Sequence, residues 1–300
     1  MDTHTRPPAE LHAKDVALVI EGGGMRNSYT AACIHELVAK NIHFGWVGGV
    51  SAGASHLVNF LSRDADRSRE AFVEFGAHPD TGGLRSMVRG NGFFNAEYIY
   101  EVAGNHDSDL PFDYQTFAAD RTPFRISAFR ADTGDTVYWG REDVSSMPSL
   151  MRKVRASSTL PGLMPMPFID DVPYVDGALG TSGGIVTEAA ESDGFTRFLV
   201  LCTRGRDFYR KPPRSPRLIR RWFRGYPHVA EAVITRHERY NAARDHLKAL
   251  EREGRALIFY PTNMRVENRE RNLKKLQQSY EDGRKQTHDE WPQWMEFLGN

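Results

Sequence analysis

Near the start of the chain, a short apolar run, a stretch of small residues and a helical segment follow one another twice, and this pattern limits the fold more than any other feature. The first unit runs from the apolar segment 16–20 through three glycines to a helical segment at 27–40. The second runs from 46–50 through Ser51 to a helical segment at 52–62. Uninterrupted apolar runs of this length are typical of strands buried in a parallel sheet. The sequence therefore predicts an α/β fold with a mainly parallel central sheet flanked by helices.

The later segments are expected to complete this fold. Residues 124–129 and 136–139 flank a turn at 131–135 and indicate a hairpin, because Gly134 tolerates a positive φ. A helix is expected at 147–158, a brief extended segment at 174–177 and a core strand at 198–202. Residues 76–115 are rich in Gly, Asn and Asp and predict loops with short helices. The first fourteen residues are polar and are expected to form a loose lead-in.

The composition changes at residues 204–225, which hold nine basic residues against one acidic residue, Asp207. Beyond this basic segment we expect a charged helix at about 229–252, a strand at 256–260, a second charged helix at about 267–285 and a Trp-rich tail. We therefore predict an α/β domain at 13–205 and a C-terminal extension at 206–300. The nine basic residues are Arg204, Arg206, Arg210, Lys211, Arg214, Arg217, Arg220, Arg221 and Arg224.

Charge and cysteine content exclude several classes of protein. The 39 basic and 39 acidic residues cancel, which argues against a nucleic-acid binder. The two cysteines, Cys33 and Cys202, are too few for a disulfide scaffold or a zinc cage, and no metal-ligand spacing is present, so we expect no metal and no other cofactor. No apolar run approaches a membrane span, and the N-terminus lacks the apolar stretch of a signal peptide. We expect a cytoplasmic protein.

A serine lies between the second predicted strand and the helix that follows it. Gly49-Val50-Ser51-Ala52-Gly53 fits the pattern G-x-S-x-G. In this context the small flanking residues allow a sharp turn that exposes the serine hydroxyl, and the helix directs its N-terminus at the site. The pattern predicts a nucleophile at Ser51. A serine that only caps the helix would suit the same position.

The three glycines after the first predicted strand suggest a binding site for negative charge. Backbone N–H groups at such a turn point into a cavity at a helix N-terminus, which favours an oxyanion or a phosphate. The segment is not a P-loop, because no Gly-Lys-Ser/Thr follows. It also lacks the last glycine of a dinucleotide fingerprint, since Asn27 stands there. We interpret it as an oxyanion hole. The alternative is a tight turn that needs glycine for steric reasons alone.

A third motif, Asp176-Gly177-Ala178, would on its own indicate only a turn. The order of glycine-rich turn, serine motif and Asp-Gly-Ala resembles that of the patatin-like phospholipases. The segments 155–161 and 174–178 also resemble that family's approach to its aspartate, and the resemblance covers about residues 15–205. The opening Glu-Gly-Gly-Gly-x-Arg and the C-terminal extension are most similar to bacterial members. Asn27 is a departure, because many members have glycine there; asparagine tolerates left-handed backbone better than other non-glycine residues.

The resemblance implies a three-layer fold with a C-terminal, mostly helical extension, a lipid or other acyl-ester substrate and a Ser–Asp dyad. Ser51 would be the nucleophile and Asp176 the base. An ordinary aspartate, with a pKa of ~3.9, is a poor base for a hydroxyl, so the dyad would depend on burial, positioning and the oxyanion hole. The oxyanion hole would comprise Gly22, Gly23, Gly24 and Met25. The supporting residues would be Arg26, Gly49, Gly53 and Gly177.

Two other functions remain open at this stage. A Ser-His-Asp triad esterase for small soluble esters would need a histidine from elsewhere in the chain. A catalytically vestigial protein that binds a lipid or a partner would need none, although Ser51 and Asp176 are both intact. The histidines weighed for the triad are His56, His228, His237, His246 and His288.

The basic segment 204–225 contains Trp222 and Phe223, and Tyr226 follows it directly. Basic residues beside aromatic ones favour peripheral contact with an anionic membrane, here at its inner face. A solvated connector is the alternative. Trp291, Trp294 and Phe297 in the tail would in the same way contact a membrane or, as we expect, pack on the protein's own domain.

Overall fold

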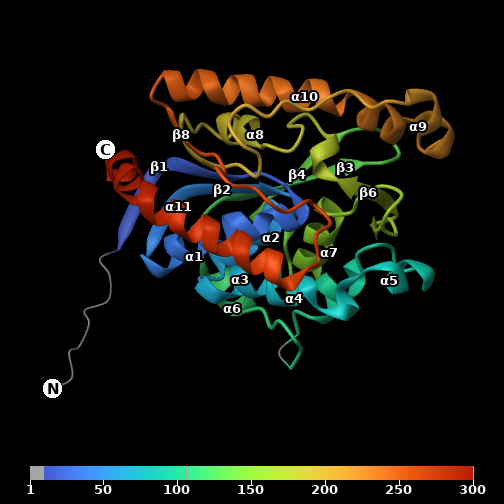
Figure 1. Cartoon of the computed structure of the whole chain (residues 1–300), viewed down its shortest axis with the longest axis horizontal. Helices are drawn as coiled ribbons and strands as arrows, with labels where there is room; N and C mark the ends of the chain where they lie inside the picture. Colours follow the sequence, from blue (N-terminus) through green and yellow to red (C-terminus); the bar gives the residue numbers. More distant parts are fainter. Residues whose placement is uncertain (1–9, 106, 300) are drawn as a thin grey trace.

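A single sheet lies between two layers of helices in the computed structural model, which describes residues 10–105 and 107–299 (Figure 1). The strand order is β5-β6-β3-β2-β1-β7-β8, and β4 pairs with β3. The strands β1, β2, β3, β7 and β8 form parallel pairs, whereas β4, β5 and β6 pair antiparallel. The strands are β1 (Leu11–Ile20), β2 (Ile42–Val50), β3 (Phe124–Arg130), β4 (Thr136–Trp139), β5 (Phe168–Ile169), β6 (Val172–Asp176), β7 (Arg197–Leu201) and β8 (Ala256–Phe259).

The predicted α/β fold with a mainly parallel sheet is confirmed, and the helices occupy both faces of the sheet. Long helices follow β1, β2 and β7, and short ones fill the segment between α2 and β3. The helices are α1 (Asn27–Ala39), α2 (Ala52–Leu61), α3 (Ala65–Phe72), α4 (Glu74–Ala77), α5 (Leu84–Val88), α6 (Tyr114–Ala119), α7 (Met147–Ser157), α8 (Thr187–Ser192), α9 (Pro216–Trp222), α10 (Pro227–Arg252) and α11 (Leu273–Gly299).

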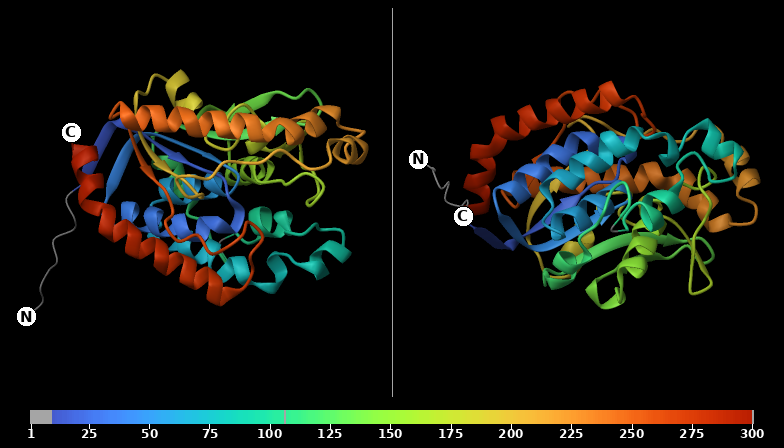
Figure 2. Two further views of the ribbon diagram at one scale, coloured as in Figure 1. Left: turned by 45° about the horizontal axis from the view of Figure 1, so that its top comes forward. Right: turned by 90° about the horizontal axis from the view of Figure 1, so that it is seen from below.

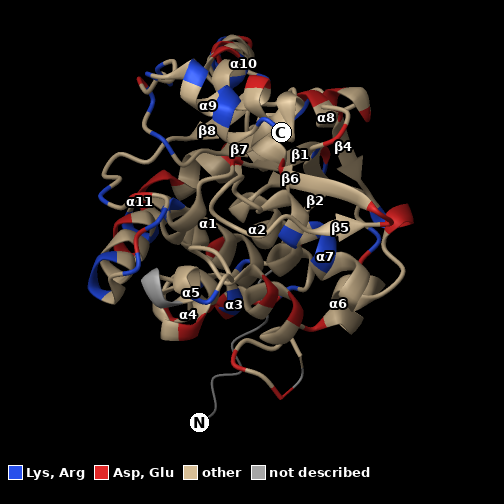
Figure 3. Cartoon of the chain, turned by 90° about the vertical axis from the view of Figure 1, so that its right-hand side faces the viewer, with Lys and Arg blue, Asp and Glu red and all other residues tan. Residues whose placement is uncertain are grey.

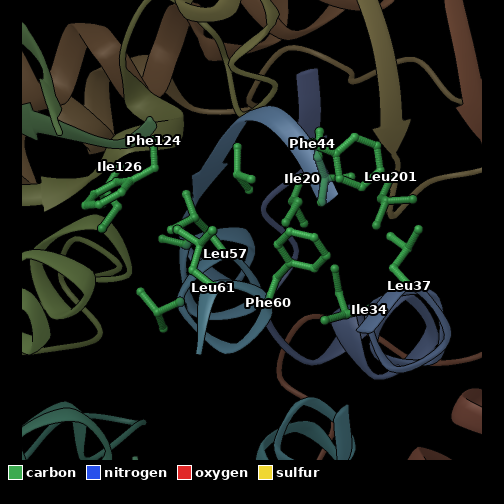
Figure 4. Packing of buried hydrophobic residues seen from close by; sticks show 14 of the residues in the cluster. Ile20, Ile34, Leu37, Phe44, Leu57, Phe60, Leu61, Phe124, Ile126 and Leu201 are labelled. Atoms are coloured by element: carbon green, nitrogen blue, oxygen red, sulfur yellow. The ribbon is translucent and has the colours of Figure 1, made fainter. Parts of the chain in front are cut away.

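Alternate residues of β1 divide the core between the two faces, as a strand buried on both sides requires. Val16, Leu18 and Ile20 pack with residues of α1, α2, α7 and α11. Ala17 and Val19 pack with residues of α8 and α10 on the other face. Figure 4 shows the first of these clusters, in which side chains of α1 and α2 rise towards the strands.

The C-terminal extension is integrated with the rest of the fold. Its strand β8 continues the sheet beyond β7, and α10 and α11 lie on opposite faces of the sheet (Figure 2). Helix α11 approaches α1 so closely that a Cβ atom on Gly283 would lie 2.2 Å from the Tyr29 carbonyl oxygen. The tail packs on its own domain, since Trp294 is fully buried. The domain boundary near residue 205 stays a prediction.

The expected bounds of two segments, the lead-in and the last helix, were wrong, and the last helix begins at Leu273 instead of near 267. Strand β1 begins at Leu11, and residues 11–13 pair with residues 42–44 of β2, so the lead-in is shorter than expected; residues 1–9 lie outside the described part of the chain. The last helix continues to Gly299 through Pro292 instead of ending near 285. Burial of Trp294 and Leu298 stabilises the additional turns, which offsets the backbone hydrogen bond that a proline removes.

Candidate active site

Ser51 lies in a sharp turn between β2 and α2. Its backbone has φ 57° and ψ −130°, a strained conformation for a residue other than glycine. The turn also requires both neighbouring glycines: a Cβ atom on Gly49 would lie 2.4 Å from the Gly53 carbonyl oxygen, and one on Gly53 would lie 2.3 Å from that of Ile20. The Ser51 N–H donates to Ser157 Oγ of α7 at 2.8 Å. These contacts hold the serine, which is buried apart from its access to a cavity, in the sharp turn expected of a nucleophile.

Asp176 reaches Ser51 because of the strand register. Val50 is the register partner of Ser127 in β3, and the next residue of β3, Ala128, pairs with Asp176 at the end of β6. Ser51 Oγ consequently donates a hydrogen bond to Asp176 Oδ2 at 2.8 Å. Asp176 Oδ1 accepts from the Ala178 N–H at 2.9 Å, which fixes the orientation of the carboxylate. The structure therefore brings together the two residues that the sequence motifs singled out.

The environment of Asp176 makes it more basic than an exposed aspartate. The side chain is buried, and this burial raises the pKa of its carboxyl group, while the positive charge of Arg236 opposes the increase. Gly177 is needed beside it, because a Cβ atom there would lie 2.2 Å from the Ser127 carbonyl oxygen. A carboxylate with a raised pKa that accepts a hydrogen bond from a serine hydroxyl is suited to remove the proton of that hydroxyl.

The glycine turn offers fewer free donors than the four that the sequence predicts. The Gly22 N–H donates to the Gly184 carbonyl oxygen at 3.2 Å, and the Met25 N–H donates to that of Asn268 at 3.0 Å. Of the four residues predicted to form the oxyanion hole, Gly23 and Gly24 have N–H groups that are not bonded to a backbone carbonyl of the described residues. With its carboxamide oxygen turned towards the turn, Asn27 accepts from the Gly23 N–H at 3.0 Å. Gly24 itself has φ 55°, which favours glycine.

Ser51, Asp176 and the glycine turn open into one cavity of about 230 Å³. Part of its lining is apolar and comes from α2 to α4, from the segment 94–110 and from α7 with the loop that follows it. Another part is cationic. The apolar lining residues are Val58, Ala71, Phe72, Phe75, Phe94, Ile99, Leu110, Met151, Val154, Leu160 and Met164. The cationic lining residues are Arg26, Arg67, Arg204, Arg210 and Arg236.

None of the histidines weighed for a triad lines this cavity. His56 is buried beneath it, where Nε2 lies 3.0 Å from the Asn27 carbonyl oxygen and burial lowers its pKa to about 4. His246 pairs with Glu191 at the surface, and His288 is largely exposed. His237 contacts the Ile234 carbonyl oxygen of its own helix, and His228 lies against Gly134.

Single replacements of these histidines by alanine are expected to leave ester turnover within about threefold of the wild-type value, because none faces Ser51. His56→Ala is the exception for stability, since it empties a fully buried position and is expected to lower the melting temperature. Steady-state kinetics with a neutral ester, together with thermal melts, would measure both. A loss of about 10³-fold in a folded variant would show that a histidine acts as the base.

One group of potential metal ligands is found in the described residues, at the start of β1 and away from the cavity. Glu10, His12 and His43 have ligand atoms within 4.8 Å of one another. Both His Nε2 atoms lie 3.1 Å from the same Glu10 oxygen, which is a sufficient partner for them. We assign no metal site here.

Two further residues contact the predicted site without having been singled out as site residues from the sequence. Ser157 lies within the segment that resembles the family's approach to its aspartate, so that resemblance was a usable indication. Asn268 has no such indication. It belongs to the loop before α11, far from the glycine turn in sequence, and its contact with Met25 depends on how the extension folds back.

Comparisons with known proteins identify the family of this chain. Residues 18–187, more than half of the chain, match the model of the family described as patatin-like phospholipase. The chain therefore belongs to the patatin-like phospholipases, a family of lipid hydrolases, and has the fold of that family. Residues 226–299 match a second model, which is described as a domain of unknown function (DUF6363).

Two individual proteins were also found to be similar. The uncharacterized protein YjjU of Escherichia coli K12 is 26% identical over 210 residues, which are 68% of this chain and 56% of that protein. The chain thus corresponds to little more than half the length of this relative. The crystal structure of VipD from Legionella pneumophila superposes with a TM-score of 0.47 at 12% identity, covering 95% of this chain and 66% of that one.

Proposed function

We propose that this protein is a serine acyl-ester hydrolase that acts on lipid substrates through a Ser51–Asp176 dyad. The observation that carries the proposal is the 2.8 Å hydrogen bond from Ser51 Oγ to Asp176 Oδ2 inside a cavity with an extensive apolar lining. An apolar lining of this extent suits an acyl chain better than a small soluble ester. The intact hydrogen bond favours an enzyme over a vestigial binding protein.

In the proposed reaction, Ser51 Oγ attacks the ester carbonyl carbon while its proton passes to Asp176 Oδ2. The negative charge that forms on the carbonyl oxygen is stabilised by the N–H group of Gly24 and by the N-terminus of α2, which begins at Ala52, while the Gly23 N–H is held by the Asn27 carboxamide. The tetrahedral intermediate collapses, the C–O bond breaks, and the alcohol leaves with the proton from Asp176. Water then attacks the acyl carbon and gives its proton to Asp176, the bond between that carbon and Ser51 Oγ breaks, Asp176 returns the proton to Ser51 Oγ, and the fatty acid is released.

A fluorophosphonate probe tests this proposal directly. Such a probe reacts with an activated serine hydroxyl, so incubation of the folded protein is expected to add one phosphonyl group per chain at Ser51. Peptide mass mapping would locate the label. Ser55 is a matched internal control, because it lines the same cavity and its hydroxyl lies 3.4 Å from that of Tyr100 instead of a carboxylate. Absence of label, or label on Ser55, would contradict the assignment.

We also propose that the basic segment contacts anionic membrane through α9. Leu218 and Trp222 are 61% and 70% exposed on this helix, beside the exposed side chains of Arg217 and Arg221; Figure 3 shows the basic residues of α9 at the outer edge of the molecule. Phe223 and Tyr226, by contrast, pack partly into the core. Among the described residues, none of the helices has the length and apolar character of a membrane span.

Vesicle co-sedimentation is expected to show binding that requires anionic lipid and weakens at high salt. Each basic side chain near the surface contributes about 1 kcal/mol, so the Arg217→Ser/Arg221→Ser/Arg224→Ser variant is expected to lose most of the binding. Arg220→Ser is the control, since Arg220 is already paired with Glu231 at 2.6 Å. Binding that is independent of lipid charge, or that survives the triple change, would identify the segment as a connector.

A further inference from the structure

Four arginines besides Arg67 line the cavity beside Ser51, and in three of them the guanidinium Nε is buried without a hydrogen-bond partner, whereas the Nε of Arg236 donates to the Gly183 carbonyl oxygen at 3.3 Å. They come from the glycine turn, from the start of the basic segment and from α10, and we refer to them as the cavity arginines: Arg26, Arg204, Arg210 and Arg236. Arg26 is only 5% exposed, yet its Nε has no hydrogen-bond partner in the described chain. The Nε atoms of Arg204 and Arg210 are likewise buried without a partner.

Arg67, which lines the same cavity, shows what a satisfied buried arginine looks like in this protein. Its guanidinium donates to the carbonyl oxygens of Pro111 and Leu110, at 2.9 Å and 3.1 Å, and to the side chain of Asn59. These hydrogen bonds account for the burial of Arg67 without a ligand. Arg26 differs, because its Nε is buried and has no hydrogen-bond partner among the described residues.

The cavity arginines also repel one another. Burial, and then the charge of Arg204, lower the pKa of Arg26 to about 10, and burial followed by the charge of Arg236 has the same effect on Arg210. Arg26 and Arg210 therefore remain charged at neutral pH. Arg26 is buried and the other three are half-buried, and like charges gathered in such a place are typical of a site that is completed by a ligand of opposite charge.

The carboxylates nearby offset this charge only in part. The charge of Glu21 favours the ionised forms of Arg26 and Arg210, but its hydrogen bonds come from the Tyr240 hydroxyl at 2.8 Å and the Thr203 N–H at 2.6 Å and not from an arginine. Glu267 is mostly exposed and lies 3.8 Å from Arg204, too far for a hydrogen bond. Asp176 is bonded to Ser51 and is the only carboxylate among the described residues that line the cavity. The lining thus offers several partners for an anion and none that is free for an ammonium group.

We propose that the cavity arginines bind the phosphate of an acylated glycerol phosphate, and that the enzyme consequently prefers ester substrates with an anionic headgroup over zwitterionic or neutral ones. The inference rests on the proposed function for its ester chemistry. Guanidinium groups bind phosphate oxygens through paired, charge-assisted hydrogen bonds, which are among the strongest that side chains form. The acyl chain would occupy the apolar lining, and the phosphate would lie on the side of the leaving alcohol.

Binding can be measured without turnover in the Ser51→Ala protein. By titration calorimetry below the micellar concentration, a monoacylglycerol phosphate is expected to bind at least about tenfold more tightly than the monoacylglycerol phosphocholine of the same chain length. Arg210→Gln and Arg236→Gln, each added to Ser51→Ala, are expected to remove about tenfold of the affinity for the phosphate lipid. Arg210→Lys keeps the charge and is expected to retain most of it. Arg252→Gln, an exposed arginine of α10, the helix that carries Arg236, is the matched control and is expected to change nothing.

Turnover then separates this inference from the proposed function. Hydrolysis of a neutral ester by the wild-type protein tests the function, whereas the ratio of kcat/KM for the phosphate and phosphocholine substrates tests the headgroup preference. A ratio that falls at least about fivefold in Arg210→Gln, with folding verified by circular dichroism, supports the inference. Equal affinity for the two headgroups overturns it. Inorganic phosphate that binds as tightly as the phosphate lipid also overturns it, because the site would then recognise a free anion.

Discussion

Replacing Ser51 with alanine is expected to reduce hydrolysis of an acyl ester by about 10⁴-fold or more. Ser51 Oγ is the hydroxyl that donates a hydrogen bond to Asp176, and no other hydroxyl among the described residues donates to that carboxylate. The variant should also fail to react with the fluorophosphonate probe. Steady-state kinetics on the purified protein, with a neutral chromogenic ester, would measure the loss. Residual turnover above about one hundredth of the wild-type rate would show that Ser51 is not the nucleophile.

Ser51→Gly provides a control that distinguishes lost chemistry from lost structure. Both variants lack the hydroxyl, but glycine relieves the strain of φ 57° at this position, whereas alanine keeps it. We therefore expect both variants to be inactive and Ser51→Gly to be more stable than Ser51→Ala by about 1 kcal/mol. Chemical denaturation would measure the difference. Equal stabilities would indicate that the turn around Ser51 is not strained.

The parts of the fold that follow from local sequence were predictable. The nucleophile turn requires Gly49 and Gly53 because the chain itself approaches those Cα atoms, and that requirement is visible in the pentapeptide. The alternation of strands and helices in the first 60 residues follows from apolar runs and their spacing. The order of the three motifs predicted the family, and the family model covering residues 18–187 confirms it.

Contacts between distant segments were not predictable from the same patterns. Nothing near Asn268 indicates that its carbonyl oxygen accepts from Met25 and so occupies one of the expected oxyanion donors. The composition of the basic segment predicts one cationic surface, yet Arg204 and Arg210 line the cavity while Arg220 forms an ion pair on the outside. The composition of a segment gives the number of its basic residues, but which of them become buried close together depends on contacts between distant parts of the chain.

Replacing Asp176 with asparagine is expected to reduce turnover by about 10³-fold or more, because the amide cannot accept the proton of Ser51. The fold is expected to persist. The amide oxygen still accepts from the Ala178 N–H, and the amide nitrogen donates where the carboxylate accepted. Because burial raises the pKa of Asp176, ionising this group costs stability above the pKa it has in the unfolded chain, so the neutral variant should melt no lower than wild type at pH 7.

The pH dependence gives the same assignment an independent test. Asp176 acts as base only when it is deprotonated, so kcat/KM for a neutral ester should fall on the acid side through the raised pKa, at a higher pH than the ordinary value of ~3.9. The charge of Arg236 opposes that rise in pKa, so Arg236→Gln should move the acid limb to still higher pH, whereas Arg217→Gln should leave it in place. An acid limb at or below pH 4 in the wild type, or one that Arg236→Gln does not move, would mean that a group other than Asp176 accepts the proton.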